Sequence, residues 1–210
     1  MHIAIVDVGL GNLRSVERAL VRAASEGGIA AQVSITRDAE AIARADKVVV
    51  PGQGAFRDCA RALDAGLGDA VRGTIQRGTP YLGICLGMQV LFASSEEAPG
   101  CSGLGIFEGE VVRLGDRDPG GERLKIPHIG WNTVDAQPGA SPMLPASPTY
   151  FYFVHSYAVR PRDPGVTAAT TTYGAPFVCA VARDNVFAVQ FHPEKSQGAG
   201  LALLTRFLRA

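Results

Sequence analysis

The stretch Pro80-Tyr81-Leu82-Gly83-Ile84-Cys85-Leu86-Gly87-Met88-Gln89 sets a cysteine directly after an apolar strand pattern and directly before a helical one. A glycine stands two residues away on each side, which gives the pattern G-x-C-x-G. This spacing permits a sharp turn that holds a reactive side chain above the carboxyl end of a sheet. The amides that open the following helix can stabilise a thiolate and a developing oxyanion. Cys85 is therefore a candidate nucleophile, with a small buried side chain as the alternative.

Short β-branched runs alternate with helical patterns on both sides of this stretch in the first half of the chain. Hydrophobic strands separated by helices of this kind form parallel sheets that are covered on both faces. We therefore predict an α/β fold, with a doubly wound, mostly parallel sheet flanked by helices. The predicted strands are His2–Val8, Ala31–Ile35, Lys47–Val50 and Tyr81–Ile84, and the predicted helices are Asn12–Ala24, Asp38–Ala45, about Ala55–Leu67, and Met88–Ala93.

The pattern changes after residue 100, where strands follow one another without long helices between them. These additional strands of the second half should be mainly antiparallel, and a helix over Gly198–Arg209 should close the fold. Segments rich in proline and glycine, at 116–121 and 136–148, are predicted to be surface loops within a single domain over residues 1–210. The predicted strands are Gly109–Leu114, Tyr150–Val154, Val166–Thr172, Phe177–Ala182 and Val186–Gln190.

Composition restricts the class of protein. Twenty basic residues balance twenty acidic ones, so no net charge favours nucleic acid or an anionic membrane. No run of about 18 apolar residues is present, and the start of the chain lacks the features of a signal peptide. We therefore expect a cytoplasmic protein. Three further cysteines lie outside any glycine-flanked turn and are expected to be free thiols without a metal-binding pattern: Cys59, Cys101 and Cys179.

A histidine and a carboxylate follow the last predicted strand in the phrase Gln190-Phe191-His192-Pro193-Glu194. A thiolate nucleophile needs a general acid for the leaving group, and a carboxylate can fix the tautomer of that imidazole and stabilise its charged form. We expect Cys85, His192 and Glu194 to form a triad. A capped turn with a surface carboxylate would give the same local pattern.

A third element is the phrase Val50-Pro51-Gly52-Gln53-Gly54-Ala55-Phe56, which follows a central strand. Its glycines allow backbone amides to approach a ligand, although a plain turn is the alternative. Ligands bind outside the carboxyl ends of parallel strands, so this turn should lie near Cys85. A donor from Gly52, Gln53 or Gly54 would then assist the amide of Leu86 at the oxyanion.

The phrases PGQGAF, GICLGMQ and QFHPEKS together resemble the class I (triad) glutamine amidotransferases, in order and spacing, over nearly the whole chain. The phrases DVGLGNLRSV, PHIGWN and YFVHSY further resemble the glutaminase subunits of imidazole glycerol phosphate synthases. This resemblance implies glutamine hydrolysis for the benefit of a separate (β/α)8-barrel cyclase subunit, in a heterodimer of histidine biosynthesis. It implies no cofactor and no metal.

The resemblance also assigns residues beyond the triad. Near the bound glutamine it places Gln89, His155, Ser156 and Tyr157, with core packing as the alternative for His155 and Tyr157. Gln53 stands where the family pattern has a small apolar residue. Toward the cyclase, with burial in this domain as the alternative for the tryptophan, the resemblance places Asn12, Trp131, Tyr152 and Lys195.

Other functions share parts of this pattern. A glutaminase that serves pyridoxal phosphate, anthranilate or guanylate synthesis would have the same triad, but DVGLGNLRSV and PHIGWN argue against it. An intracellular cysteine peptidase would share the nucleophile turn and would not require PGQG and HPE together. A non-catalytic interaction subunit is disfavoured by the intact triad.

Overall fold

One continuous sheet runs through the protein. The structure, a computed structural model, describes residues 1–145 and 148–210. Its strands are β1 (His2–Val6), β2 (Gln32–Thr36), β3 (Lys47–Gly52), β4 (Tyr81–Cys85), β5 (Phe92–Ser95), β6 (Phe107–Arg113), β7 (His128–Ala136), β8 (Thr149–His155), β9 (Tyr157–Pro161), β10 (Thr167–Tyr173), β11 (Ala175–Arg183) and β12 (Val186–Val189). Its helices are α1 (Leu13–Glu26), α2 (Ala39–Ala43), α3 (Phe56–Ala62), α4 (Gly68–Gln76), α5 (Leu86–Gln89) and α6 (Gln197–Arg209), with an irregular turn η1 (Leu63–Leu67) and 3₁₀ turns η2 (Pro164–Val166) and η3 (Pro193–Lys195).

The sheet has a parallel and an antiparallel part. Its strand order is β2-β1-β3-β4-β12-β11-β10-β7-β8, and β5, β6 and β9 form a branch that joins it through β11. Strands β2, β1, β3, β4 and β12 are parallel, which confirms the predicted fold class. The second half is mainly antiparallel, as predicted, but β12 runs parallel to β4 and β5 runs parallel to β6.

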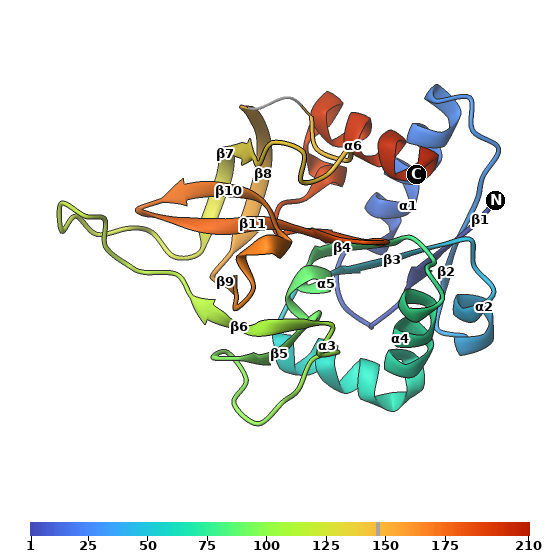
Figure 1. Cartoon of the computed structure of the whole chain (residues 1–210), viewed down its shortest axis with the longest axis horizontal. Helices are drawn as coiled ribbons and strands as arrows, with labels where there is room; N and C mark the ends of the chain where they lie inside the picture. The colour runs from blue at the N-terminus through green and yellow to red at the C-terminus, as the bar shows by residue number, and fades with distance from the viewer. Residues whose placement is uncertain (146–147) are drawn as a thin grey trace.

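Helices cover both faces of the parallel part (Figure 1). On one face, α1 and α6 pack together with the apolar side chains of β1 and β4, including Leu20, Leu82 and Phe207. On the other face, α2, α3 and α4 bury Ile42, Phe56 and similar side chains against β3. The carboxyl ends of β3, β4 and β12 lie between these layers, so the loops that follow them meet at one edge.

Several elements differ from the sequence prediction. The predicted helix Met88–Ala93 is wrong, because α5 ends at Gln89 and Phe92 begins strand β5. The carbonyl oxygens of Val90 and Leu91 accept hydrogen bonds from residues 104, 106 and 107, so tertiary pairing overrides the helical pattern. The single helix predicted near 55–67 is shorter and is followed by α4, with Gly66 in the left-handed region between them.

Strands β7 and β9 were absent from the prediction, and α1 begins one residue after Asn12, whose side chain caps the helix. In the predicted loop 136–148, residues 137–145 form turns and connecting chain, and residues 146 and 147 lie outside the described residues. No helix of residues 1–145 and 148–210 is long and apolar enough to cross a membrane.

The close packing of α6 on η3 gives a test of how the fold holds the His192–Glu194 segment. A β-carbon at Gly200 would overlap the carbonyl oxygen of Pro193, whereas one at Gly198 would meet no atom within 4 Å. We expect Gly200→Ala to lower the free energy of unfolding by about 2–3 kcal/mol. The matched control Gly198→Ala should change it by less than about 0.5 kcal/mol. Chemical denaturation measures both, and equal stabilities would contradict this packing.

Candidate active site

Cys85 ends β4 in a backbone conformation that residues other than glycine rarely adopt. Its φ is 55° and its ψ is −106°, and α5 begins at the next residue. A β-carbon at Gly83 would overlap the carbonyl oxygen of Gly87, and one at Gly87 would overlap that of Val50. The glycines are therefore required for this turn, and the turn holds Cys85 at the carboxyl edge of the sheet.

His192 and Glu194 form a buried pair at the end of the neighbouring strand β12. His192 Nδ1 lies 2.7 Å from Glu194 Oε1, and the two side chains are 1% and 4% exposed. Among the described residues, His192 Nε2 and Glu194 Oε2 have no hydrogen-bond partner. The bonded carboxylate fixes the orientation of the ring and leaves Nε2 for other chemistry.

Strand β8 holds this pair in place through the backbone. His192 N donates to the carbonyl oxygen of Tyr152 at 2.9 Å, and Tyr152 N donates to Ser196 Oγ at 2.9 Å. Ser196 Oγ in turn donates to the carbonyl oxygen of His192 at 2.6 Å. These bonds close a buried loop around the segment 192–196, so its side chains are held by main-chain geometry.

Electrostatics favour a charged ring at His192. Burial alone would lower its pKa, but hydrogen bonding and charge interactions with Cys85 and with Glu194 outweigh burial and raise the pKa to about 9. Because no hydrogen bond of ordinary length reaches Nε2 within the described residues, we attribute the influence of Cys85 to attraction between the sulfur and the charged ring. The site therefore favours the charged form of the His192 ring.

A small cavity opens beside Cys85. It has a volume of about 240 Å³, which suits a molecule the size of an amino acid. Of the residues predicted near the oxyanion and the glutamine, Gly52 does not line it, but Gly52 lies opposite Cys85 in the pairing of β3 with β4. The predicted residues that line the cavity are Gln53, Gly54, Leu86, Gln89, His155, Ser156 and Tyr157.

Two residues at the site were missed by sequence reasoning. Glu97 lines the cavity, and its Oε2 accepts a hydrogen bond from Phe56 N at 2.9 Å. Gln190, which is fully buried, donates from Nε2 to Cys85 Sγ at 3.4 Å. Gln190 belongs to the QFHPE phrase and could have been noticed there, but Glu97 carries no local signal because only tertiary packing brings it to the cavity.

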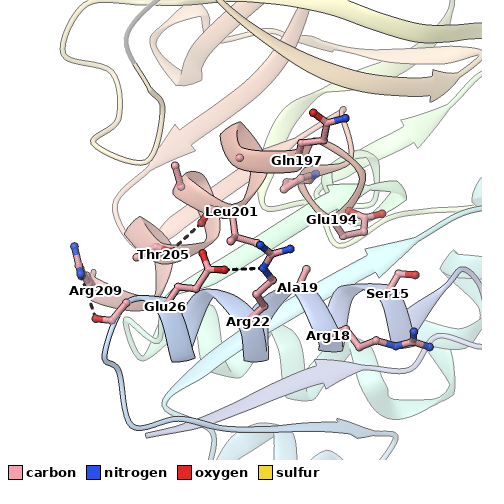
Figure 2. Close-up of a pocket in the computed structure, with 14 residues that line it drawn as sticks. Ser15, Arg18, Ala19, Arg22, Glu26, Glu194, Gln197, Leu201, Thr205 and Arg209 are labelled. Carbon is pink, nitrogen blue, oxygen red and sulfur yellow. Dashed lines mark hydrogen bonds and ion pairs between the residues drawn. The ribbon is translucent and has the colours of Figure 1, made fainter.

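A larger hollow, of about 790 Å³, lies between α1 and α6 (Figure 2). The side chains along it are those of surface helices, with Arg22 paired to Glu26 at 2.7 Å. Glu194 reaches this hollow from the site, at the end where Ser15 and Gln197 lie. The described residues that line this hollow include no cysteine or histidine, and the smaller cavity beside Cys85 is the candidate active site.

Three of the four residues predicted at the partner surface lie together. The rings of Trp131 and Tyr152 meet edge to face with centroids 6.1 Å apart, and Lys195 Nζ lies 6.0 Å from the centre of the Tyr152 ring. Trp131 is 47% exposed, which excludes burial in its own domain. Asn12 lies at the start of α1, where its Oδ1 accepts from Ser15 N at 3.1 Å.

Comparison with known proteins gives the family. The model of the class-I glutamine amidotransferase family matches residues 4–210, and the chain belongs to that family. Relatives from Rhodospirillum rubrum and Nitrosospira multiformis are 45% and 51% identical to it. The alignments cover 100% and 99% of this chain and 99% and 97% of the relatives, and both relatives are named imidazole glycerol phosphate synthase subunit HisH. The chain is accordingly an enzyme of the glutamine amidotransferase class.

Solved structures support the same fold. A crystal structure of a glutamine amidotransferase superposes with a TM-score of 0.73 at 20% identity and covers 99% of each chain. The glutaminase domain of Trypanosoma brucei CTPS, solved with bound acivicin, superposes with a TM-score of 0.70 at 19% identity, over 99% of this chain and 92% of that one. At these identities the likeness concerns the fold alone.

The raised pKa of His192 predicts how its charge responds to pH. Because the folded value of about 9 lies above the ordinary 6.5, the stabilisation from the charged ring is complete below pH 6.5 and is lost as pH rises through about 9. We expect an NMR titration to give a midpoint near 9 for His192 and lower midpoints in Cys85→Ser and Glu194→Gln. A midpoint near 6.5 in the unchanged protein would contradict this account.

Proposed function

We propose a mechanism by which this chain, the glutaminase subunit of an imidazole glycerol phosphate synthase, hydrolyses glutamine and supplies ammonia to a cyclase subunit. The thiolate of Cys85 attacks the side-chain carbonyl carbon of glutamine, and a C–S bond forms. The carbonyl oxygen then carries the negative charge, which the amide of Leu86 and an amide of the Gly52-Gln53-Gly54 turn are placed to stabilise. The observation that supports this most directly is the strained Cys85 turn beside the buried His192–Glu194 pair.

His192 moves the protons in both halves of the reaction. As the tetrahedral species collapses, the imidazolium gives a proton to the departing nitrogen, the C–N bond breaks, and ammonia and a thioester result. The neutral ring then takes a proton from a water molecule, which attacks the thioester. The C–S bond breaks, glutamate leaves, and the thiolate and imidazolium are restored. Glu194 holds the ring and stabilises its charge throughout.

The cavity offers groups that suit the amino-acid end of glutamine. Both protons of the Gln89 amide are engaged, one by the carbonyl oxygen of Tyr157 and one by Gln190 Oε1. Its carbonyl oxygen is therefore the group left to meet a ligand, and it accepts hydrogen bonds, as does the carboxylate of Glu97. These acceptors would hold the ammonium group of glutamine, with His155 and Ser156 on the lining of the same cavity.

The outer face of the β7–β8 ribbon is proposed as the surface for the cyclase. Ile129, Trp131 and Tyr150 are 52%, 47% and 60% exposed, and together they form an apolar patch of the kind that marks a protein interface. Tyr152 and Lys195 extend this patch toward the His192 segment.

The assembly proposed on this basis is a cytoplasmic heterodimer with a (β/α)8-barrel cyclase. Residues 1–210 would act as a single glutaminase domain, and Asn12 would add to the interface. Ammonia would pass through the complex without meeting bulk water, and the lyase step that makes imidazole glycerol phosphate would take place on the cyclase. The backbone of Tyr152 is hydrogen-bonded to that of His192, which favours an exit for ammonia at this face.

The nucleophile can be tested in the assembled synthase. We expect Cys85→Ser to abolish glutamine-dependent synthesis while added ammonium salt still supports the cyclase, because only the thiolate forms the thioester. Cys101→Ser, which removes a partly buried thiol away from the site, should behave as the unchanged enzyme. Near-normal use of glutamine by the Cys85→Ser complex would overturn the assignment.

The docking surface can be tested by affinity. We expect Trp131→Ala to weaken binding to the cyclase by at least about 30-fold, because a central exposed aromatic residue commonly supplies 2 kcal/mol or more. Val21→Ala, which alters an exposed apolar residue on α1, is the matched control and should bind normally. Calorimetry with the purified cyclase measures both, and equal affinities would remove Trp131 from the interface.

A further inference from the structure

A line of buried and partly buried hydrogen bonds leads from β7 to the sulfur of Cys85. Asn132 Nδ2 lies 3.4 Å from His128 Nε2, and His128 Nδ1 lies 3.0 Å from His155 Nε2. His155 Nδ1 lies 2.8 Å from the carbonyl oxygen of Tyr157. That oxygen lies 3.1 Å from Gln89 Nε2, and Gln89 Nε2 lies 3.1 Å from Gln190 Oε1. Gln190 Nε2, at the other end of the line, lies 3.4 Å from Cys85 Sγ.

The direction of the last bonds is fixed by one backbone carbonyl. The oxygen of Tyr157 can only accept, so the Gln89 atom that faces it must be the amide nitrogen. That nitrogen also faces Gln190, which must therefore present its oxygen to Gln89. The other end of the Gln190 amide, the nitrogen, then faces Cys85 as a donor. A reversed Gln190 would set two donors against each other and turn an acceptor toward the thiolate.

The two histidines are fixed in the same way from a second carbonyl. Asn132 Nδ2 donates to the carbonyl oxygen of Thr172 at 2.9 Å, so the same nitrogen is a donor toward His128 Nε2. His155 must carry its proton on Nδ1, because that atom faces the carbonyl of Tyr157. His155 Nε2 is then the acceptor, so His128 must donate to it from Nδ1. All the groups between the two carbonyls thus have one consistent polarity.

This polarity requires both histidines to be neutral, and their surroundings favour that state. Burial lowers the pKa of His155 to about 3 and that of His128 to about 4. The ring of His128 stacks between Tyr173 and Phe153, at centroid distances of 4.1 and 5.0 Å. A proton added to either ring would set N–H against N–H in the middle of the line.

We propose, on the basis of the function proposed above, that Gln190 donates to the Cys85 thiolate and that His128 and His155 are positioning residues. They hold the Tyr157 carbonyl, which sets the direction of this donation through Gln89. A donor on the sulfur stabilises the thiolate before attack, and again when the thioester breaks. His128 does not itself line the glutamine cavity, and its ring is hydrogen-bonded to His155, which does, so we expect the effect of its side chain on the sulfur to pass through this line of bonds.

The position of His128 also connects this line to the outer surface. Side chains alternate along β7, so His128 and Asn132 point inward where Ile129 and Trp131 point outward. The strand that carries the proposed docking patch therefore carries the first groups of the hydrogen-bonded line. Movement of β7 on docking would act on the orientation of Gln190 at the sulfur.

The test uses the full synthase and four variants, with a kinetic and a chemical readout. We expect Gln190→Met, which keeps the side-chain length and removes the donor, to lower kcat for glutamine roughly 10- to 100-fold. KM should stay near its normal value, because Gln190 does not line the cavity. Alkylation of Cys85 by iodoacetamide, followed by mass spectrometry of its peptide, should slow in parallel because less thiolate is present.

The second variant tests the histidines. His128→Phe keeps the ring stacking and removes the donor to His155, so kcat and Cys85 alkylation should both fall, by about 3- to 10-fold, with KM retained. His128→Asn places an amide nitrogen close to the former Nδ1 and should recover most of the loss. Phe177→Leu loosens the same aromatic cluster without touching the line of bonds, and should lower the unfolding temperature while kcat stays normal.

The outcomes separate the two proposals. If Gln190→Met and His128→Phe both alkylate and turn over as the unchanged enzyme does, the line of bonds plays no part at the sulfur. If Phe177→Leu slows both as much as His128→Phe, or His128→Asn fails to recover them, the effect is packing and this inference is wrong. Glutamine turnover that survives Cys85→Ser would refute the proposed function itself. The alkylation rates decide the role of Gln190 in either case.

Discussion

The backbone conformation of Cys85 is the constraint on which the rest of the site depends. A φ of 55° at a residue with a side chain costs roughly 1–3 kcal/mol, and it persists because the surrounding packing allows no alternative. Gly83 and Gly87 let the elbow fold upon itself and against Val50, and the register of β3 with β4 sets Gly52 opposite the cysteine. The sulfur thereby meets the imidazole that follows β12, the strand next to β4. The fold thus supplies the geometry, and the neighbouring charges supply the reactivity.

Local signals predicted the part of the site that lies within a few residues of a motif. The elbow at Cys85 and the His192–Glu194 turn were readable because each depends on residues close in sequence. Glu97 and the Gln89–Gln190 bond were not, because they depend on contacts across the fold, and the latter joins residues 101 positions apart. The parallel sheet was predicted from its alternating pattern. Strand β7 was missed because glycine and polar side chains interrupt that pattern, and the helix expected at 88–93 gave way to pairing of β5 with β6.

Three buried histidines of this protein have pKa values that are shifted in opposite directions. Burial lowers the pKa values of His128 and His155, whereas at His192 the interactions with Cys85 and Glu194 outweigh burial and raise the pKa. The charged ring stands where the proposed reaction needs a proton. The neutral rings stand where the Tyr157 carbonyl is held, and β7 and β8 carry both of them opposite each other in register.

The central claim is that the sulfur of Cys85 is the atom to which the glutamine side chain becomes attached. A glutamine analogue with a chloromethyl ketone in place of the amide would alkylate the attacking group as it enters the cavity. Peptide mapping of the inactivated synthase should find one label per chain, on Cys85, with glutamine protecting against it and ammonia-dependent synthesis preserved. Complete inactivation with the label on another residue, or with Cys85 unmodified, would contradict the account.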